Sequence, residues 1–192
     1  MIYIDRLCSS NISITFGSGT SEFTNETFGI QTNYQQIIGR LVFDGEFAFV
    51  NRVPEHYNWH SGALDHTEGD INGYMFLCGG AYNPGQVFNY TFQNLCAETR
   101  YEFSIYATSI GKASIPNHTE PSFTFEILTT TNHSLLASLN TGMMSDYDEM
   151  TWSKYSMLFT TQSTSAILVV KSNVPGGFGN DFAIDDIQLR VY

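Results

Sequence analysis

The sequence is short of positive charge and contains no long apolar run. Lysine and arginine total 8 of 192 residues, against 19 aspartates and glutamates, which gives a formal net charge of -11. This balance repels nucleic acid and anionic lipid, so we expect neither as a partner. No apolar run approaches the roughly 18 residues that a membrane-spanning helix needs, and no membrane span is predicted. A neutral ligand or a cation is the more natural partner.

Cysteine is scarce as well, and its count is odd. The chain holds Cys8, Cys78 and Cys96, so at least one is free or paired outside the chain. A bridge from Cys78 to Cys96 is disfavoured, because the intervening residues predict one strand of about ten residues, at about 3.3 Å each. Cys8 with Cys96, Cys8 with Cys78, and three buried thiols all remain open.

The start of the chain, "MIYIDRLCSS", has no apolar segment of the kind found in signal peptides. Either Met1 begins a cytosolic protein or the chain is part of something longer. Five Asn-x-Ser/Thr sequences favour the second interpretation. These predicted glycosylation sites are Asn11, Asn25, Asn89, Asn117 and Asn132. We therefore expect an extracellular or cell-surface module of a larger multidomain protein.

No window of 12 or more residues keeps a helical period, whereas alternation of apolar and polar residues runs through most of the chain. In "VFNYTFQ" the residues Phe88, Tyr90 and Phe92 share one face, and "RYEFSIYA" and "PSFTFEI" alternate in the same way. Turn motifs such as "GGAYNPG", "GKASIPN", "LNTG" and "NVPGGFGN" separate the strands. About ten strands at this spacing predict an all-β fold, a two-layer antiparallel β-sandwich of the jelly-roll type, with residues 1–192 as a single domain.

Motifs for catalysis are missing or weak. There is no Gly-x-Ser-x-Gly elbow and no P-loop, and no pair of carboxylates stands out as a glycosidase acid and base. One loop holds four residues of types that bind transition metals: His56, His60, His66 and Asp65. Pro54 and Gly62 oppose the helix that this spacing needs, so solvated histidines are favoured. The acidic stretch 145–150, "SDYDEM", is interpreted as a solvated loop.

The last strand carries an irregular pattern in "NDFAIDDIQL". Phe182 and Ile184 share one parity, whereas Ile187 and Leu189 share the other, so a regular strand cannot direct them all to one core. A bulge at the paired aspartates 185–186 resolves the conflict. It leaves one carboxylate pointing inward, which is acceptable if a cation receives it.

Several motifs follow one another in an order that resembles a known group. "DHT", "GYM", "LCAETRYEF" and the closing "GNDFAIDDI" look like the extracellular jelly-roll modules of the MAM and galactose-binding-like group, including carbohydrate-binding-like modules of surface proteins. The opening "ITFGSGTS" resembles the Phe-Gly-x-Gly that begins such modules. The chain lacks the four-cysteine pattern of a true MAM domain.

The resemblance implies a non-catalytic module that holds a structural calcium ion and binds a glycan or a surface protein. It places the ion at Asp186, with Asp185 as its neighbour, and gives Asp65 and oxygens near Thr15 to Ser18 as further ligands. Calcium takes six to eight oxygen ligands, which carboxylates and loop carbonyls supply. The alternative is that Asp186 pairs with Arg100 or with backbone donors.

The ligand surface is expected in the loops. Sugars stack on exposed aromatic rings while amides and carboxylates bind their hydroxyls. Trp59, flanked by Tyr57 and Asn58 in a long loop, is the favoured platform, and Tyr82 is a second candidate. Large aromatic side chains more often lie in the core. A structural spacer or a protein-binding module without a glycan ligand remains the alternative function, and a hydrolase is the least favoured.

Overall fold

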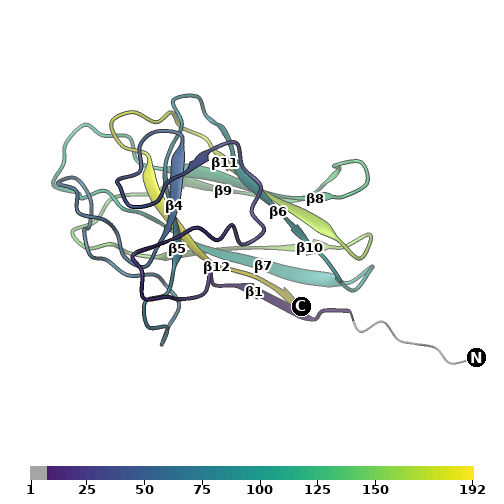
Figure 1. Cartoon of the computed structure of the whole chain (residues 1–192). Helices are drawn as coiled ribbons and strands as arrows, with labels where there is room; N and C mark the ends of the chain where they lie inside the picture. Colours follow the sequence, from purple (N-terminus) through teal and green to yellow (C-terminus); the bar gives the residue numbers. More distant parts are fainter. Residues whose placement is uncertain (1–7) are drawn as a thin grey trace, which may run out of the picture.

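Two β-sheets pack face to face in the computed structural model of the chain, which describes residues 8–192 (Figure 1). The larger sheet follows the order β10 (Ser153–Thr160), β7 (Arg100–Ser109), β12 (Asp181–Val191), β5 (Met75–Gly79), β4 (Glu46–Val50) and β2 (Phe23–Thr24). β1 (Asn11–Ile14) pairs with β12, and the short β3 (Gln35–Gln36) pairs with β4 in parallel. The smaller sheet consists of β6 (Gly85–Phe92), β11 (Ala166–Ser172), β8 (Ser122–Thr129) and β9 (Leu135–Met143).

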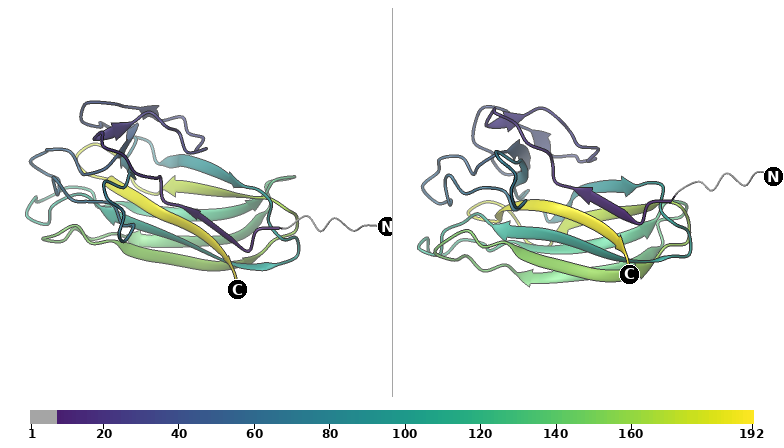
Figure 2. Two further views of the ribbon diagram at one scale, coloured as in Figure 1. Left: turned by 60° about the horizontal axis from the view of Figure 1, so that its bottom comes forward. Right: turned by 90° about the horizontal axis from the view of Figure 1, so that it is seen from below.

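Apart from the β3 pairing, all ladders are antiparallel, and the two layers are seen side-on in Figure 2. This is the predicted two-layer β-sandwich. Residues 8–192 contain no helix, and therefore none that is long and apolar enough to cross a membrane.

The core between the sheets follows from the alternation in the sequence. Strands β6, β7 and β8 direct every second residue inward, and most of the inward side chains are fully or almost fully buried, as with Phe88, Phe103 and Phe125. Tyr90 on β6 is the exception and is only partly buried. Aromatic rings pack edge-to-face across the core, for example Phe123 on Phe182 at 4.5 Å between centroids. Such contacts add to the free energy of burial.

One turn prediction is wrong. "LNTG", residues 139–142, lies within β9 and does not separate two strands. Gly142 has a left-handed φ of 70°, and the register of β9 against β8 shifts beside it. The glycine therefore marks an irregularity within an edge strand, a role that its sequence context does not distinguish from a turn.

The bulge in β12 is confirmed. The register against β7 shifts between Asp185 and Gln188, and Asp186 adopts a left-handed φ of 47°. On its other side, β12 pairs with β5 up to Ile184 and with β1 from Ile187 onward. The bulge therefore lies where β12 exchanges one neighbour for another, and it returns Ile187 to the main core.

A second apolar cluster covers the outer face of the larger sheet. The connection between β4 and β5 folds back over that face, so that Val53 and Trp59 pack with Ala183 and Leu77. Asp185 shares the parity of Ala183. The two aspartates of the bulge are therefore buried against this connection and not in the core between the sheets, which corrects the inward direction expected for one of them.

The pairing registers divide the connections between two ends of the sandwich. The turns β6–β7, β8–β9 and β10–β11 lie at one end, beside the place where the chain enters at residue 8 (Figure 1). The connections β5–β6, β7–β8, β9–β10 and β11–β12 lie at the opposite end. We call these the disulfide end and the loop end.

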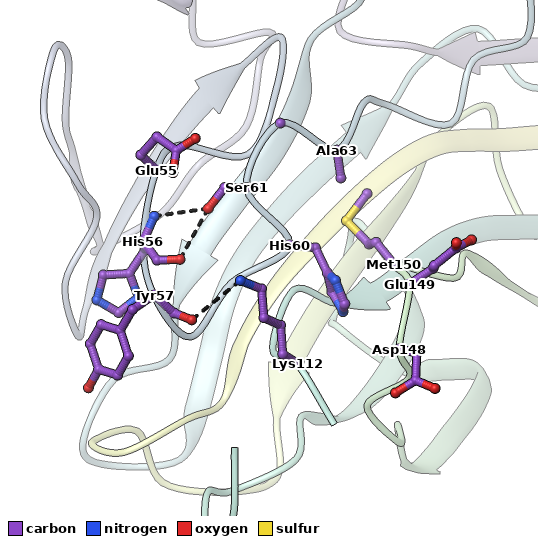
Figure 3. Close-up of a pocket in the computed structure, with 11 residues that line it drawn as sticks. Glu55, His56, Tyr57, His60, Ser61, Ala63, Lys112, Asp148, Glu149 and Met150 are labelled. Carbon is purple, nitrogen blue, oxygen red and sulfur yellow. Dashed lines mark hydrogen bonds between the residues drawn. The ribbon is translucent and has the colours of Figure 1, made fainter. Parts of the chain in front are cut away.

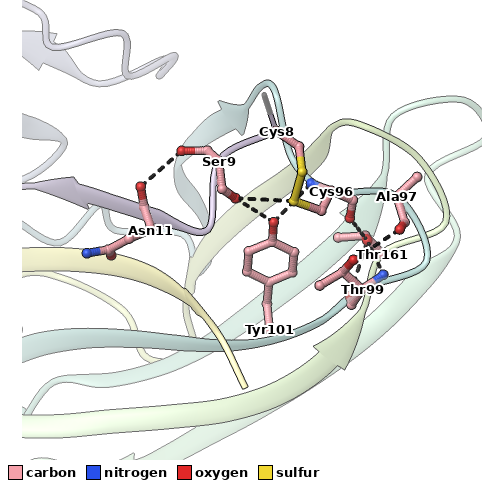
Figure 4. The surroundings of a disulfide bond; sticks show 8 residues. All are labelled: Cys8, Ser9, Asn11, Cys96, Ala97, Thr99, Tyr101 and Thr161. Atoms are coloured by element: carbon pink, nitrogen blue, oxygen red, sulfur yellow. Dashed lines mark hydrogen bonds between the residues drawn. A yellow bond between two sulfur atoms is a disulfide. The ribbon is translucent and has the colours of Figure 1, made fainter. Parts of the chain in front are cut away.

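A disulfide between Cys8 and Cys96 closes the disulfide end, which selects one of the pairings that the sequence left open. Cys78 is a free, fully buried thiol. Around the bridge, the Tyr101 hydroxyl donates to the Ser9 carbonyl at 2.6 Å and accepts the Cys96 amide at 2.9 Å (Figure 4). The bridge and these hydrogen bonds tie the start of the chain to the β6–β7 turn.

Candidate functional site

The first candidate site is the acidic cluster, which we define as Asp65, Asp185 and Asp186 with His66 and Thr67. One oxygen of Asp186 accepts from His66 Nδ1 at 2.6 Å, and the other accepts from the Thr67 hydroxyl at 3.0 Å. The His66 amide donates to Asp185 Oδ2 at 3.0 Å, and the Thr67 amide donates to Asp65 at 3.2 Å. "DHT" and "DDI" are thus brought together, although 118 or more residues separate His66 and Thr67 from their partners in the last strand.

Burial and mutual repulsion make this cluster electrostatically unfavourable. Burial, followed by the charge of Asp186, raises the pKa of Asp185 to about 8. Burial also raises the pKa of Asp65, and the charges of Asp70 and Asp186 add to that effect. Asp185 Oδ1 is buried without a hydrogen-bond partner. Closely spaced buried carboxylates are a setting that a bound cation would stabilise.

The cluster can be tested against the ligand set predicted for calcium. Its carboxylate and hydroxyl oxygens are the hard donors that calcium prefers, and the orphaned Asp185 oxygen is free to coordinate. Within residues 8–192, however, no three His, Cys, Asp or Glu side chains are arranged to hold a metal ion. The donor types fit calcium, and an ion here would also need hydroxyl or backbone oxygens. The same finding removes the support for a zinc site in the described residues.

Two further residues were predicted to contact Asp186 or its ion, namely Thr15 as a ligand and Arg100 as the alternative partner. Thr15 directly follows β1, whose last residue Ile14 pairs with Ile187, so Thr15 lies beside the bulge without a polar contact to the cluster in the described structure. Arg100 is not the partner of Asp186. It lies over the Tyr192 ring at 5.1 Å, while His66 takes the place expected for it.

The second candidate site is a pocket of about 220 Å³ at the loop end, which we call the aromatic pocket. Segments 41–44, 56–59 and 177–179 line it together with Asp181. These segments lie far apart in the sequence and meet because β4, β5 and β12 are neighbours in the larger sheet. At Gly176, a Cβ atom would overlap the Gly80 carbonyl oxygen, so the close approach of the β11–β12 connection requires glycine there.

Exposed aromatic rings line the mouth of this pocket. Phe43 is 62% exposed, Tyr57 71% and Phe178 50%. Tyr82 is also exposed, and a hydrogen bond to Asp44 raises the pKa of its phenol. Exposed rings of this size are unusual, since large aromatic side chains are usually buried.

The sequence-predicted ligand residues are thus gathered, with one correction. Tyr57 and Asn58 line the aromatic pocket, and Tyr82 lies beside its Asp44 wall. Trp59 is only 3% exposed and cannot be an exposed platform. Its ring packs in the second apolar cluster because the β4–β5 connection folds over the sheet, and only its edge reaches the pocket.

The polar group beneath the rings is Asp181. The Trp59 indole N–H donates to its Oδ2 at 2.9 Å. Burial raises the pKa of Asp181 to about 7, opposed by the Trp59 hydrogen bond and reinforced by the charge of Asp44. Asp181 belongs to the motif "GND", but the sequence offers no sign that it faces a pocket.

An open groove of about 770 Å³ adjoins the aromatic pocket and shares His56 and Tyr57 with it. Figure 3 shows these two side chains on one side, Asp148 and Glu149 on the other, and Lys112 between them. The Lys112 ammonium donates to the Tyr57 carbonyl at 3.4 Å. Together the groove and the pocket offer a continuous surface for an extended ligand.

A buried hydrogen-bond network lies behind the pocket and was missed from the sequence. Asp146 accepts from both Ser109 and His118, and His118 Nδ1 lies 2.6 Å from the Ile115 carbonyl. The Asp146 side chain is only 4% exposed, so the interpretation of 145–150 as a solvated loop is wrong for this residue. Exposed Asp148 and Glu149 agree with that interpretation. Its partners come from the end of β7 and from the β7–β8 connection, which local sequence cannot indicate.

The loop end also concentrates polar atoms without partners. In residues 8–192, five buried side-chain atoms have no hydrogen-bond partner, and four of them belong to residues that line cavities at this end: His56 Nδ1, Asn58 Oδ1, His60 Nε2 and Asn180 Oδ1. Such groups are costly when unpaired and are usually satisfied by water or by a ligand.

The predicted glycosylation sites differ in exposure. Asn11, Asn25, Asn117 and Asn132 are exposed, whereas Asn89 is half-buried in β6 with its backbone paired to Gln31. The four exposed sites are sterically suitable for a glycan.

Comparison with known proteins finds structures of similar fold but no related sequence family. No protein-family model and no curated protein matches the chain. Among solved structures, the CBM22-1 xylan-binding domain from Paenibacillus barcinonensis Xyn10C is similar, with a TM-score of 0.51 and 14% identity over 94% of this chain and 92% of that one. The arabinose-bound MgGH51 α-L-arabinofuranosidase reaches a TM-score of 0.52 and 10% identity, over 97% of this chain and 27% of that one.

The enzymatically active domain of bacteriophage CBA120 tailspike protein 4 is also similar, with a TM-score of 0.50 and 11% identity. The similarity covers 93% of this chain and 22% of that one. None of these three structures is a MAM domain. At such low identities the likeness concerns the fold. The chain is a jelly-roll β-sandwich, the architecture that it shares with this xylan-binding domain.

Proposed function

We propose that the chain is a non-catalytic glycan-binding module, stabilised by calcium, within a larger extracellular or cell-surface protein. The observation that carries this proposal is the aromatic pocket, where exposed rings surround polar groups that lack partners. Aromatic rings bind the apolar face of a sugar, and amide and carboxylate groups bind its hydroxyls. The fold supports the same proposal, since one similar structure is a xylan-binding domain.

The extracellular setting rests on two features. The Cys8–Cys96 disulfide is of a kind that persists in oxidising compartments. Four predicted glycosylation sites have exposed side chains. Neither feature identifies the larger protein.

Calcium is proposed at the acidic cluster, where oxygens of Asp185, Asp186 and Asp65 would bind it together with hydroxyl or backbone oxygens, because residues 8–192 contain no three acidic, histidine or cysteine side chains already arranged around an ion. The ion would offset the charge of Asp186, which raises the pKa of both Asp185 and Asp65, and it would coordinate the orphaned oxygen of Asp185. It would therefore stabilise the junction of β12 with β5 and β1. Its role is structural, since the cluster and the aromatic pocket have no residue in common.

Glycan binding is tested on a panel of immobilised plant, bacterial and animal polysaccharides. Tyr57→Ala is expected to weaken binding about tenfold or more, since a stacked aromatic ring contributes on the order of 1–2 kcal/mol. Tyr192→Ala is the matched control, because Tyr192 is 72% exposed at the disulfide end. A blank panel would favour the spacer or protein-binding alternative.

The same panel tests for hydrolysis. Asp44 and Asp181 do line one pocket, which is the minimum that a glycosidase needs. Both are engaged in structural hydrogen bonds, from the Gly177 amide to Asp44 at 2.9 Å and from Trp59 to Asp181. We expect no release of reducing ends, and reproducible release that Asp181→Asn abolishes would establish the hydrolase instead.

The calcium proposal is tested by melting the protein with calcium and with a chelator. Calcium is expected to raise the melting temperature by several degrees, as a ligand that binds only the folded state does. Asp186→Ala should abolish that gain, whereas Asp148→Ala, a change to an exposed carboxylate of the open groove, should preserve it. Melting curves that coincide with and without chelator would count against the site.

A further inference from the structure

The aromatic pocket is negatively charged and has no cationic side chain in its lining. Asp44 contributes a carboxylate, and Asp181, whose pKa burial raises to about 7, is partly ionised at neutral pH and would become fully charged beside a bound cation. None of the lining residues is lysine or arginine. His56 lines the pocket too, and burial together with Lys112 lowers its pKa, so it is neutral at pH 7. A pocket of this charge disfavours uronic acids and sulfated sugars.

The nearby positive groups are already engaged elsewhere. Arg40 binds Glu46 through two hydrogen bonds of 2.9 and 2.7 Å. Lys112 lies in the open groove and donates to a carbonyl there, and His118 pairs with Asp146. In the described structure no lysine or arginine pairs with Asp181. The imidazole of His118 lowers the pKa of Asp181 but is itself hydrogen-bonded to Asp146.

The remaining groups of the pocket favour a ligand that donates hydrogen bonds. Asn58 Oδ1 is a buried acceptor without a partner, and so is Asn180 Oδ1 in the small cavity beside it. An ammonium group has three donors and no acceptor. The exposed rings of Phe43, Tyr57 and Phe178 attract cations through their π faces, and the Arg40 guanidinium already lies 5.2 Å from the Phe43 centroid.

We propose that the aromatic pocket binds a hexosamine unit with a free amino group, whose ammonium interacts with Asp181 and Asp44. The inference rests on the proposed function, since it names the sugar that this site prefers. A volume of about 220 Å³ is small for a ligand pocket, so it suits a single ring. Neighbouring units of a chain would lie in the open groove, where Glu55, Asp148 and Glu149 outnumber Lys112.

The test compares two oligosaccharides of equal length, one made of glucosamine and one of N-acetylglucosamine, by calorimetric titration at neutral pH. Acetylation replaces the ammonium with a neutral acetamido group and leaves the rest of the pyranose ring unchanged, so the variants below separate the effect of charge from that of the added acetyl group. The glucosamine oligomer is expected to bind about tenfold more tightly or better, the scale of one charge-assisted contact, and the preference should shrink as salt is raised.

Three variants locate the charge that is recognised. Asp181→Asn and Asp44→Asn should each reduce the preference toward equality, and the asparagine at position 181 keeps an oxygen to accept the Trp59 N–H. Glu98→Gln is the matched control, because Glu98 is an exposed carboxylate beside the disulfide. Melting temperatures verify that each variant is folded, and if Asp181→Asn fails to fold, Asp44→Asn carries the test.

The outcomes separate this inference from the proposed function. Equal binding of both oligomers, or tighter binding of the acetylated one, overturns the amine preference and leaves glycan binding intact. An equal loss in Glu98→Gln and Asp181→Asn means general attraction to a negatively charged protein, which also overturns it. If neither oligomer binds and the polysaccharide panel is blank, both proposals fail.

Discussion

At the disulfide end the polar groups are paired, whereas at the loop end many are not. Beside the bridge, Tyr101, Thr161 and the Cys96 backbone form hydrogen bonds of 2.6 to 2.9 Å. At the opposite end, four buried polar atoms lack partners and the aromatic side chains are exposed. The first end is built for stability, and the second retains the unfavourable features that a ligand would relieve.

The disulfide gives the largest expected effect. Cys96→Ser should lower the free energy of unfolding by roughly 4 to 5 kcal/mol, because the bridge closes a loop across a sequence separation of 88 residues and so restricts the unfolded chain. Denaturant titration measures the loss, and reduction of the unmodified protein should reproduce it. Cys78→Ala, a change to the free thiol, should not abolish the response to reductant. Equal stability of the oxidised and reduced protein would contradict the prediction.

Trp59→Phe tests whether the loop end depends on the hydrogen bond between Trp59 and Asp181. The substitution removes the N–H that reaches Asp181 and should cost about 1–3 kcal/mol of unfolding free energy, since it withdraws a donor from a buried carboxylate. Trp152→Phe is the matched control, because its indole makes no hydrogen bond within residues 8–192. If the two substitutions cost the same, ring volume and not the hydrogen bond explains the effect.

Asp181 should also make the stability depend on pH. Its pKa of about 7 in the folded state lies above the value of about 3.9 for an unfolded chain. Between these values the folded state keeps a proton that the unfolded state has lost, so this contribution is full below about pH 4 and is lost as pH rises to about 7. The slope is at most about 1.4 kcal/mol per pH unit.

Asp181→Asn should flatten that slope in chemical denaturation across the same pH range. Glu98→Gln, a change to an exposed carboxylate at the other end, should leave it unchanged. A slope that persists in Asp181→Asn would assign it to another group, such as Asp185, whose pKa is about 8.

The smallest effect on stability is expected from the rim of the aromatic pocket. Tyr57→Ala and Phe178→Ala should each change the free energy of unfolding by no more than about 0.5 kcal/mol, because both side chains are at least half exposed. Parallel unfolding curves measure this, with Phe125→Ala as a buried contrast that should cost about 3–5 kcal/mol. A large loss at Tyr57 would mean that the rim supports the fold and is not reserved for a ligand.

The sequence predicted the elements well because strands follow from local alternation. The faces of β6, β7 and β8 and the bulge at Asp185 and Asp186 are all as expected, since each depends on residues within one strand. The prediction of a turn at 139–142 was wrong because glycine occurs both in turns and in irregular edge strands, and the local sequence does not distinguish the two.

The candidate sites were predicted only in part. Tyr57, Asn58 and the aspartates of the acidic cluster were named from the sequence, whereas Trp59 was expected to be exposed and Asp146 to be solvated. Those two errors have one cause. Both side chains lie in connections whose environment is set by distant parts of the chain, β12 for Trp59 and the end of β7 for Asp146. The identity of those neighbours follows from strand order.

Local alternation was therefore enough to predict most of the strands, their inward faces and the position of the bulge, but not β9, because the side-chain period of two is a local property. The Cys8–Cys96 bond, the burial of Trp59 against Asp181, and the single pocket formed by segments 41–44, 56–59 and 177–179 depend instead on the tertiary structure. These contacts join residues far apart in the chain, and they arise from the order in which the strands pair.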